Sequence, residues 1–246
     1  MLKDVGIFDE IAPGHAAEAS DVQQDGSSPA PTSTAARFAS RIRSVSSLVV
    51  RGYLSTYHRL EIVGRGRLPA RGPFMMVSNH SSHLDAICLR AALPRQQLAA
   101  SFTAVAEDYF MASAFRRMAA KIFANAVPFS RDVRVRGGMR RCLSLLSGDN
   151  AVLIFFPEGT RTTTGAMSAF RPGIGALLAG SSLPVVPCAI VGAFEAWPKG
   201  QRIARPRAIR VTIGQPRTYA AFPRNHQSHR AVSDDLRSAV EAMLCK

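Results

Sequence analysis

The chain has 246 residues, of which 47% are hydrophobic, so it can build one large domain or two small ones around a substantial core. Its formal net charge is +14, and residues 1–36 hold six acids and one base, so they carry −5 and the remainder carries +19. A body that basic suits an anionic membrane surface or a phosphorylated or CoA-type substrate. We expect no nucleic-acid partner, because aromatic residues make up only 7% of the chain and lie mostly inside apolar runs.

The sequence also argues against several structural classes. Its four cysteines are widely spaced and form no C-x-x-C pair, unlike those of a zinc knuckle or a disulfide framework. No run approaches about 18 apolar residues, and the first residues lack the basic-then-apolar pattern of a signal peptide. We therefore expect a peripheral protein without a transmembrane helix, on the cytoplasmic face of a membrane.

The first two segments of the chain differ in composition. Residues 13–36 are rich in Ala, Ser and Pro, and we expect the whole of 1–36 to be a disordered tail. From 37 to 58, apolar residues recur at steps of three and four, which predicts an amphipathic helix. Its stripe contains Phe38, Ile42, Val45, Leu48 or Val49, and Gly52 or Tyr53. This stripe can face a core or lie in a membrane interface, and both can hold at different positions of one helix.

Beyond residue 58, apolar runs of strand length alternate with helical patterns. In chain order we expect a strand at 60–64, a turn, a strand at 74–78, a helix at 83–93, a strand at 98–106, helices at 107–124 and 134–147, a strand at 151–156, a helix at 170–180, strands at 184–191 and 208–213, and a helix at 230–244. Several of these strands are apolar throughout. The pattern predicts a single α/β domain over 37–246, with a largely parallel or mixed central sheet and helices on both faces.

Two histidines and a carboxylate follow the strand at 74–78, in the stretch SNHSSHLD. An imidazole is the usual general base near neutral pH, and it works best when a carboxylate holds its other ring nitrogen. Asp85 can fold back on His80 if the segment turns into a helix N-terminus. The same stretch also fits a metal site of His80, His83 and Asp85, or a polar turn without chemistry.

A second polar loop follows the strand at 151–156 and reads PEGTRT. Gly159 permits close backbone approach to a ligand, Thr160 offers a hydroxyl, and Arg161 offers a planar fork suited to phosphate. A turn with a surface ion pair between Glu158 and Arg161 is the simpler interpretation. Two weaker segments are VPFSRD, with Arg131 in a loop, and the strand VPCAIVG.

Together, and in this order, these four segments resemble the glycerophospholipid acyltransferase family, typified by 1-acylglycerol-3-phosphate acyltransferases. The family's first block, N-H-x4-D, is present in SNHSSHLD, and its third block, F-P-E-G-T-R-S/T, matches residues 156–162. Its second block carries an Arg in a loop, matched by Arg131, although Asn125 stands where a Gly usually begins the stretch. Its fourth block is the V-P strand at 186–192, and the resemblance covers roughly 58–215.

The resemblance implies transfer of an acyl group from acyl-CoA or acyl-carrier protein to the hydroxyl of a lysophospholipid, most simply 1-acylglycerol-3-phosphate. His80 would be the base and Asp85 its orienting acid, with no metal or cofactor. The acceptor would be bound by Arg131, Glu158, Gly159, Thr160 and Arg161. Backbone N–H groups near Gly159 are expected to stabilise the oxyanion.

Other functions stay open at this point. The acceptor can be another lysolipid, such as a lyso-ornithine lipid, or glycerol 3-phosphate, because the same base and acid serve any hydroxyl. A non-catalytic basic module that binds membranes, and a metal-dependent hydrolase, are the alternatives from other classes.

Overall fold

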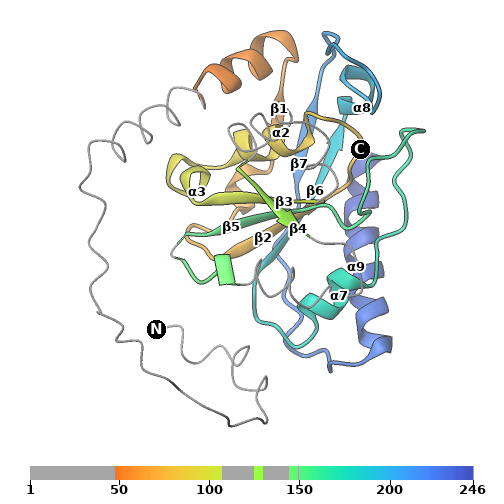
Figure 1. Cartoon of the computed structure of the whole chain (residues 1–246). Helices are drawn as coiled ribbons and strands as arrows, with labels where there is room; N and C mark the ends of the chain where they lie inside the picture. Colours follow the sequence, from red (N-terminus) through yellow and green to blue (C-terminus); the bar gives the residue numbers. More distant parts are fainter. Residues whose placement is uncertain (1–47, 107–124, 130–143, 149, 246) are drawn as a thin grey trace, which may run out of the picture.

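The computed structural model describes residues 48–106, 125–129, 144–148 and 150–245 (Figure 1). Five predictions lie wholly or partly outside these residues: the tail at 1–36, residues 37–47 of the helix at 37–58, the helix at 107–124, most of the helix at 134–147, and the site residue Arg131.

The described residues form a seven-stranded sheet with the order β1-β7-β6-β2-β5-β3-β4. Its strands are β1 Glu61–Val63, β2 Phe74–Ser78, β3 Ser101–Ala106, β4 Ala126–Phe129, β5 Val152–Phe155, β6 Val185–Val191 and β7 Arg210–Ile213. Strands β6, β2, β5, β3 and β4 run parallel, whereas β7 is antiparallel to β6 and pairs in parallel with β1. The prediction of a largely parallel or mixed sheet is confirmed.

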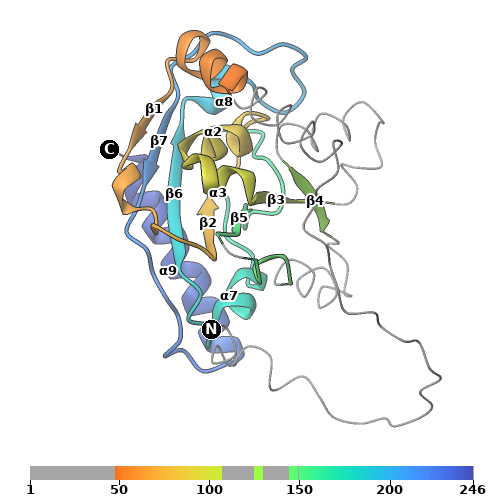
Figure 2. The same cartoon turned by 90° about the vertical axis from the view of Figure 1, so that its left-hand side faces the viewer.

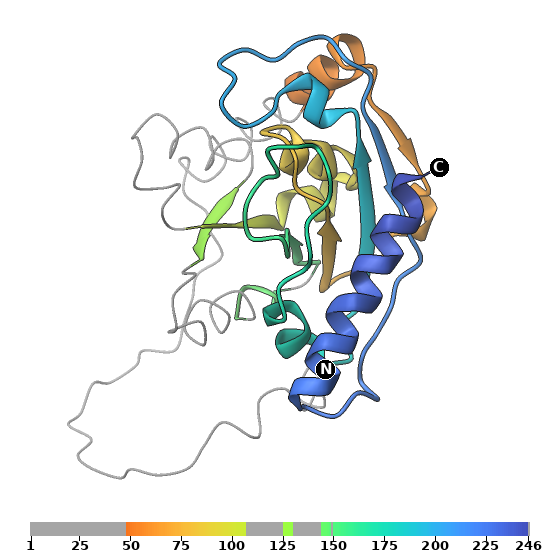
Figure 3. The same ribbon diagram turned by 90° about the vertical axis from the view of Figure 1, so that its right-hand side faces the viewer.

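Helices cover both faces of this sheet. They are a helix at 48–57, η1 Arg65–Arg67, α2 Asp85–Ala92, α3 Arg95–Ala99, α7 Gly173–Leu178, α8 Ala193–Ala196 and α9 His226–Leu244. Figure 2 shows α2 and α3 in front of one face, and Figure 3 shows α9 and α7 along the other. Each face therefore has its own hydrophobic core.

Strand β2 shows how the sequence supplies both cores. Phe74 and Met76 pack with α2 and α3, while Met75 and Val77 pack with α7 and α9. All four side chains are 0% exposed. A strand with helices on both sides is apolar along nearly all its length, because neither face meets water. The one polar residue of β2, Ser78, is buried at its end with its hydroxyl hydrogen-bonded to Asn79.

Strand β4 is an element that the sequence analysis missed. Among the described strands it pairs with β3 alone, at the edge of the sheet, and Pro128 lies within it. A proline has no backbone N–H to donate between strands, so a short sequence that contains one is normally predicted to be a loop. An edge strand tolerates a proline because it pairs on one side only. The predicted strand at 98–106 is likewise shorter, since α3 begins after Pro94 and occupies its first residues.

Helix α9 begins four residues before its predicted start at 230. The Asn225 side chain accepts a hydrogen bond from the Ser228 backbone N–H at 2.8 Å and caps the helix. The first turn of α9 thus consists of residues that show no apolar periodicity. They are helical because the Asn225 side chain accepts a hydrogen bond from a backbone N–H that has no partner within the helix.

The helix at 48–57 turns a different face to the core from the one its apolar stripe indicated. Leu54 is fully buried and Val50 packs on the core, whereas Leu48 and Val49 are 64% and 65% exposed. The stripe of Leu48 or Val49 with Gly52 or Tyr53 thus lies toward solvent in the described part of the helix. No helix within the described ranges combines the length and apolar character needed to cross a bilayer.

We predict that Gly175→Ala destabilises the fold. Gly175 lies where α7 meets α9, and an added Cβ would be 1.8 Å from the His229 carbonyl oxygen. Separating the two helices should lower the free energy of unfolding by about 1–3 kcal/mol. Urea denaturation measures this. Gly173→Ala in the same helix is the control, because its Cβ would meet nothing within 4 Å. Equal stability of the two variants would contradict the packing described.

Candidate active site

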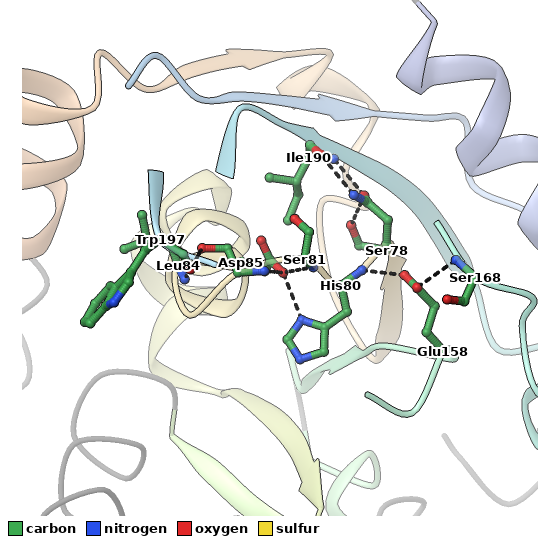
Figure 4. A network of polar contacts seen from close by, with 11 residues as sticks. Ser78, His80, Ser81, Leu84, Asp85, Glu158, Ser168, Ile190 and Trp197 are labelled. Carbon is green, nitrogen blue, oxygen red and sulfur yellow. Dashed lines mark hydrogen bonds and ion pairs between the residues drawn. The ribbon is translucent and has the colours of Figure 1, made fainter. Parts of the chain in front are cut away.

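Three loops meet at the carboxyl ends of the parallel strands β2, β5 and β6. In the register of the sheet, Val77 is paired with Phe155. His80 and Glu158 each follow these paired residues by three positions, so parallel pairing places them at one edge of the sheet. Two segments that are 78 positions apart in the chain therefore contact each other directly, as Figure 4 shows.

His80 and Asp85 form a hydrogen-bonded pair. The His80 Nδ1 atom lies 2.8 Å from Asp85 Oδ2. A carboxylate can only accept, so Nδ1 carries the proton and the lone pair of neutral His80 is on Nε2. Asp85 is fully buried, while 23% of the His80 side chain is exposed. Nε2, which can accept a proton, thus belongs to a partly exposed ring, whereas the carboxylate that binds Nδ1 is buried.

The same oxygen of Asp85 also organises the loop between β2 and α2. It accepts hydrogen bonds from the backbone N–H groups of Ser81 at 2.7 Å and Ser82 at 2.8 Å. Asp85 is the first residue of α2, where the helix dipole favours a negative charge. The spacing His-x4-Asp works here because the loop reverses within four residues and the helix starts on the carboxylate.

Phe156 fixes the plane of the His80 ring. The two rings are stacked, with centroids 4.1 Å apart and planes inclined by 16°. Phe156 follows β5 and is itself buried. A residue from the PEGTRT side of the site therefore packs against His80, the predicted base on the SNHSSHLD side, and the hydrogen bond to Asp85 fixes the ring's remaining rotation.

Glu158 joins the two loops through main-chain groups. Its Oε1 accepts from the His80 N–H at 2.6 Å and its Oε2 from the Ser168 N–H at 2.8 Å. Only 4% of Glu158 is exposed, and burial raises the pKa of its carboxyl while the two backbone N–H groups oppose that shift. The prediction that Glu158 contacts the acceptor stays a prediction, whereas its hydrogen bond with the His80 backbone is part of this structure.

Asn79 ties the loop to β6. Its side-chain amide donates to the Ile190 carbonyl and accepts from the Ile190 N–H, both at 2.9 Å. Ser78 Oγ donates to the same Asn79 oxygen at 3.2 Å. The amide thus continues the hydrogen-bonding pattern of the sheet by one residue, so His80 leaves β2 from a fixed position.

His83 lies apart from the pair. Its ring packs beside Trp197, with centroids 5.0 Å apart, and its backbone N–H donates to the Trp197 carbonyl at 3.3 Å. Within the described ranges, no group of three or more His, Cys, Asp or Glu side chains is arranged to hold a metal ion.

The loop after Glu158 turns sharply over the site. Gly159 has φ +76°, a left-handed backbone conformation that residues with a side chain rarely adopt. Its N–H donates to the Phe156 carbonyl at 3.1 Å. That N–H is therefore engaged in the turn, and the expectation that backbone N–H groups near Gly159 stabilise an oxyanion stays a prediction. Thr160 is exposed, Arg161 is half-buried, and the Thr162 N–H donates to the His80 carbonyl at 2.9 Å.

Asn125 adopts a conformation that explains why it can replace a glycine. Its φ is +44°, in the left-handed region that Asn tolerates better than other residues with side chains. Its side-chain amide also donates to the Ser101 carbonyl at 2.7 Å, which an Ala could not do. The departure from the family pattern at this position therefore preserves the backbone that precedes β4.

Two contributors to the site escaped the sequence analysis. Ser168 acts through its backbone N–H, which carries no signature in a sequence. The Arg171 side chain lies over Gly159 and donates to the Glu158 carbonyl at 3.3 Å. The available signal was its place directly before the Pro-Gly pair that opens α7, because that pair marks the end of the loop and the start of the helix.

Comparison with known proteins defines the class to which this fold and site belong. A model of the Acyltransferase family matches residues 59–191, which is 133 of the 246 residues. The chain belongs to this family. The matched region holds His80, Asp85 and the whole PEGTRT loop, and it ends at the last residue of β6.

Individual relatives share the same description. The chain is 30% identical to the chloroplastic 1-acyl-sn-glycerol-3-phosphate acyltransferase BAT2 of Brassica napus over 164 residues, 65% of this chain and 45% of that protein. It is 29% identical to the human 1-acyl-sn-glycerol-3-phosphate acyltransferase alpha over 159 residues, 64% of this chain and 52% of that protein. The chain thus spans about half the length of these relatives.

A solved structure shows the same fold. The crystal structure of the 1-acyl-sn-glycerophosphate (LPA) acyltransferase PlsC from Thermotoga maritima matches with a TM-score of 0.59 and 20% sequence identity. The match covers 84% of this chain and 86% of the Thermotoga chain.

We predict that Glu158→Gln weakens the fold in a pH-dependent way. The amide nitrogen of Gln cannot accept from a backbone N–H, so at neutral pH the free energy of unfolding should fall by about 1–3 kcal/mol. Burial raises the pKa of the Glu158 carboxyl in the folded state. The proton-linked contribution of this carboxyl to the free energy of unfolding is therefore fully present below the ordinary pKa of about 4.3, and it is lost as the pH rises through the raised pKa. The difference between wild type and variant should therefore grow as the pH is lowered.

Urea denaturation of wild type and Glu158→Gln, from neutral pH down to below the ordinary pKa of the carboxyl, measures the difference in the free energy of unfolding. Glu195→Gln is the matched control, because Glu195 is exposed on α8. A wild-type advantage that is independent of pH, or equal for both substitutions, would contradict the buried position of Glu158.

Proposed function

We propose that this protein is an O-acyltransferase that moves a fatty acyl group from a thioester to the free hydroxyl of a lysophospholipid, most simply 1-acylglycerol-3-phosphate, giving phosphatidic acid. The observation that carries the proposal is the His80–Asp85 pair, with a buried acid and a base that solvent reaches. Membership of the Acyltransferase family and the names of the relatives support the same reaction.

The pair can run the reaction by general base and acid catalysis. Nε2 of His80 takes the proton as the acceptor hydroxyl attacks the thioester carbonyl carbon, and Asp85 stabilises the imidazolium that forms. The tetrahedral intermediate then expels the thiolate, which receives the proton from His80. One C–O bond forms, one C–S bond breaks, and the products are the ester and the free thiol.

The PEGTRT loop is proposed to bind the acceptor beside this base. Arg161 would pair with the acceptor's phosphate through its planar guanidinium, while Gly159 and Thr160 would approach its glycerol. Thr162 supports this placement, since its N–H to the His80 carbonyl holds the loop at the base. Arg131 and direct contacts from Glu158 complete the proposed set.

The donor and the surroundings follow from charge. Acyl-CoA and acyl-carrier protein are both anionic, as is the leaflet from which a lysophospholipid would come, and the chain carries a net +14. We propose that the protein works as a peripheral enzyme on an anionic membrane surface, with the helix at 37–58 against the lipid.

The decisive test is thiol release from oleoyl-CoA in detergent, with lysophosphatidic acid as acceptor. His80→Ala should lower kcat by about 10²-fold or more, because the base is lost. Asp85→Asn should also lower kcat by about 10²-fold or more, since a neutral amide cannot stabilise the imidazolium. Chelator should have no effect, whereas a metal-dependent hydrolase would lose its activity.

The control is His226→Ala, which removes an exposed histidine at the start of α9. Wild-type turnover by His80→Ala would overturn the proposed role of the pair. An inactive wild type would move the test to acyl-carrier-protein donors and to lyso-ornithine lipid or glycerol 3-phosphate as acceptors. Inactivity with every pair of substrates would favour a membrane-binding module.

A second prediction concerns the acceptor. Arg161→Ala should raise the KM for lysophosphatidic acid by about tenfold or more, because a charge-assisted hydrogen bond to phosphate is lost. Arg161→Lys should fall between, since it keeps the charge without the fork. Monoacylglycerol, which has no phosphate, and the exposed neighbouring variant Thr163→Ala provide the controls. An equal rise of KM for both acceptors would count against phosphate recognition by Arg161.

A further inference from the structure

The connection between α8 and β7 presents cations and one exposed apolar side chain. Residues 197–209 contain no acidic residue. Ile203 is 79% exposed, the highest value among the large exposed hydrophobic residues of the described part of the chain. The exposed cations around it are Lys199, Arg202, Arg205 and Arg207. We call residues 197–207, which carry these four cations and Ile203, the basic loop.

The exposure of Ile203 is built into the fold, because the backbone around it is anchored. The Arg205 N–H donates to the Ala196 carbonyl at 2.8 Å, and the Trp197 indole donates to the Gln201 carbonyl at 3.0 Å. The Tyr57 hydroxyl donates to the Ala204 carbonyl at 3.2 Å. With the backbone held in this way, the side chains of Ile203 and the four cations point into solvent.

The basic loop begins on the catalytic side of the molecule. Ser82 Oγ donates to the Trp197 carbonyl at 2.8 Å, and the His83 N–H donates to the same oxygen. The loop that carries His80 and the basic loop are thus joined by direct hydrogen bonds.

The helix at 48–57 lies at the same end of the molecule. In Figures 1–3, this helix and the connection from α8 to β7 occupy one end in every view, and the first turns of α9 lie at the opposite end. The helix exposes Leu48 and Val49 there, and its last turn is bonded to the basic loop through Tyr57. Exposed apolar side chains from two distant parts of the sequence therefore share one end with the site.

We propose that the basic loop is a docking surface for an anionic lipid bilayer, with Ile203 entering the headgroup region and the four cations meeting the phosphates. Surface-bound elements of membrane proteins combine these features, cations for anionic headgroups and apolar side chains for the acyl boundary. The inference rests on the proposed function in one respect, since a lipid acceptor would then enter the site from the bilayer beside it.

A bilayer fits the observations better than a carrier protein. An acidic carrier would pair with the four cations, but it offers no reason for apolar side chains on both the basic loop and the helix at 48–57. A bilayer is an extended apolar phase behind a charged layer, so it can receive both. The carrier protein is therefore the alternative that the experiment has to separate.

The test is co-sedimentation of the full chain with phosphatidylcholine vesicles containing about one-third phosphatidylglycerol, compared with pure phosphatidylcholine vesicles. Arg202→Ala/Arg205→Ala should lower the partition coefficient on anionic vesicles by about 25-fold, from roughly fivefold per cation. Ile203→Ser should lower it by about tenfold on the same vesicles, because the apolar contact is lost. Thiol release in detergent should stay at the wild-type level for both variants.

The matched control is Arg71→Ala/Arg230→Ala, which removes the same charge from exposed positions before β2 and in the first turns of α9. It should bind vesicles within about twofold of wild type, since neither site faces the bilayer. Equal losses for the two double variants would show a general charge effect and overturn the proposal. Wild-type vesicle binding by Arg202→Ala/Arg205→Ala would overturn it as well, and a raised KM for an acyl-carrier-protein donor would then assign the surface to that partner. An inactive wild type whose vesicle binding needs the basic loop would contradict the proposed reaction and support the docking surface.

Discussion

One carboxylate oxygen holds the proposed catalytic centre together. Asp85 Oδ2 receives the His80 ring and the backbone N–H groups of Ser81 and Ser82, all within 2.8 Å. A buried charge is costly without hydrogen bonds, and the three that reach Oδ2 tie the loop to the His80 ring, while Oδ1 is buried without a protein partner. The tautomer of His80, the path from β2 into α2 and the start of the helix all depend on that arrangement.

Around this carboxylate, neighbouring strands supply the rest of the support. Glu158 from the end of β5 holds the His80 backbone, Phe156 holds its ring, and Asn79 reaches across to β6. Each contact is made to a main-chain group or to the face of a ring, so the Nε2 atom of His80 stays free of them. These contacts hold the proposed base in place without help from a substrate, which is the arrangement that preorganised catalysis needs.

This arrangement also connects the chemistry to the outer surface. The loop of the base is bonded to Trp197, and from Trp197 the chain continues into the basic loop, which Tyr57 ties to the helix at 48–57. A site whose proposed base is held by hydrogen bonds and ring stacking, beside a cationic and partly apolar surface, suits the proposed acceptor, which is both charged and lipid. The net +14 of the chain thus has a local counterpart beside the site.

The sequence by itself determined the features that depend on local spacing. The apolar runs of β2 and β5 predicted buried strands, and the four residues between His80 and Asp85 predicted their pairing, because a short turn and a helix start lie within reach of one another. Only the tertiary structure decided which distant groups meet. Strand order, set by packing on both faces, brought Glu158 to the backbone of His80 and left β4 at an edge that accepts a proline. It also showed which face of the helix at 48–57 is exposed, because that depends on where the core lies and not on the period of the apolar residues.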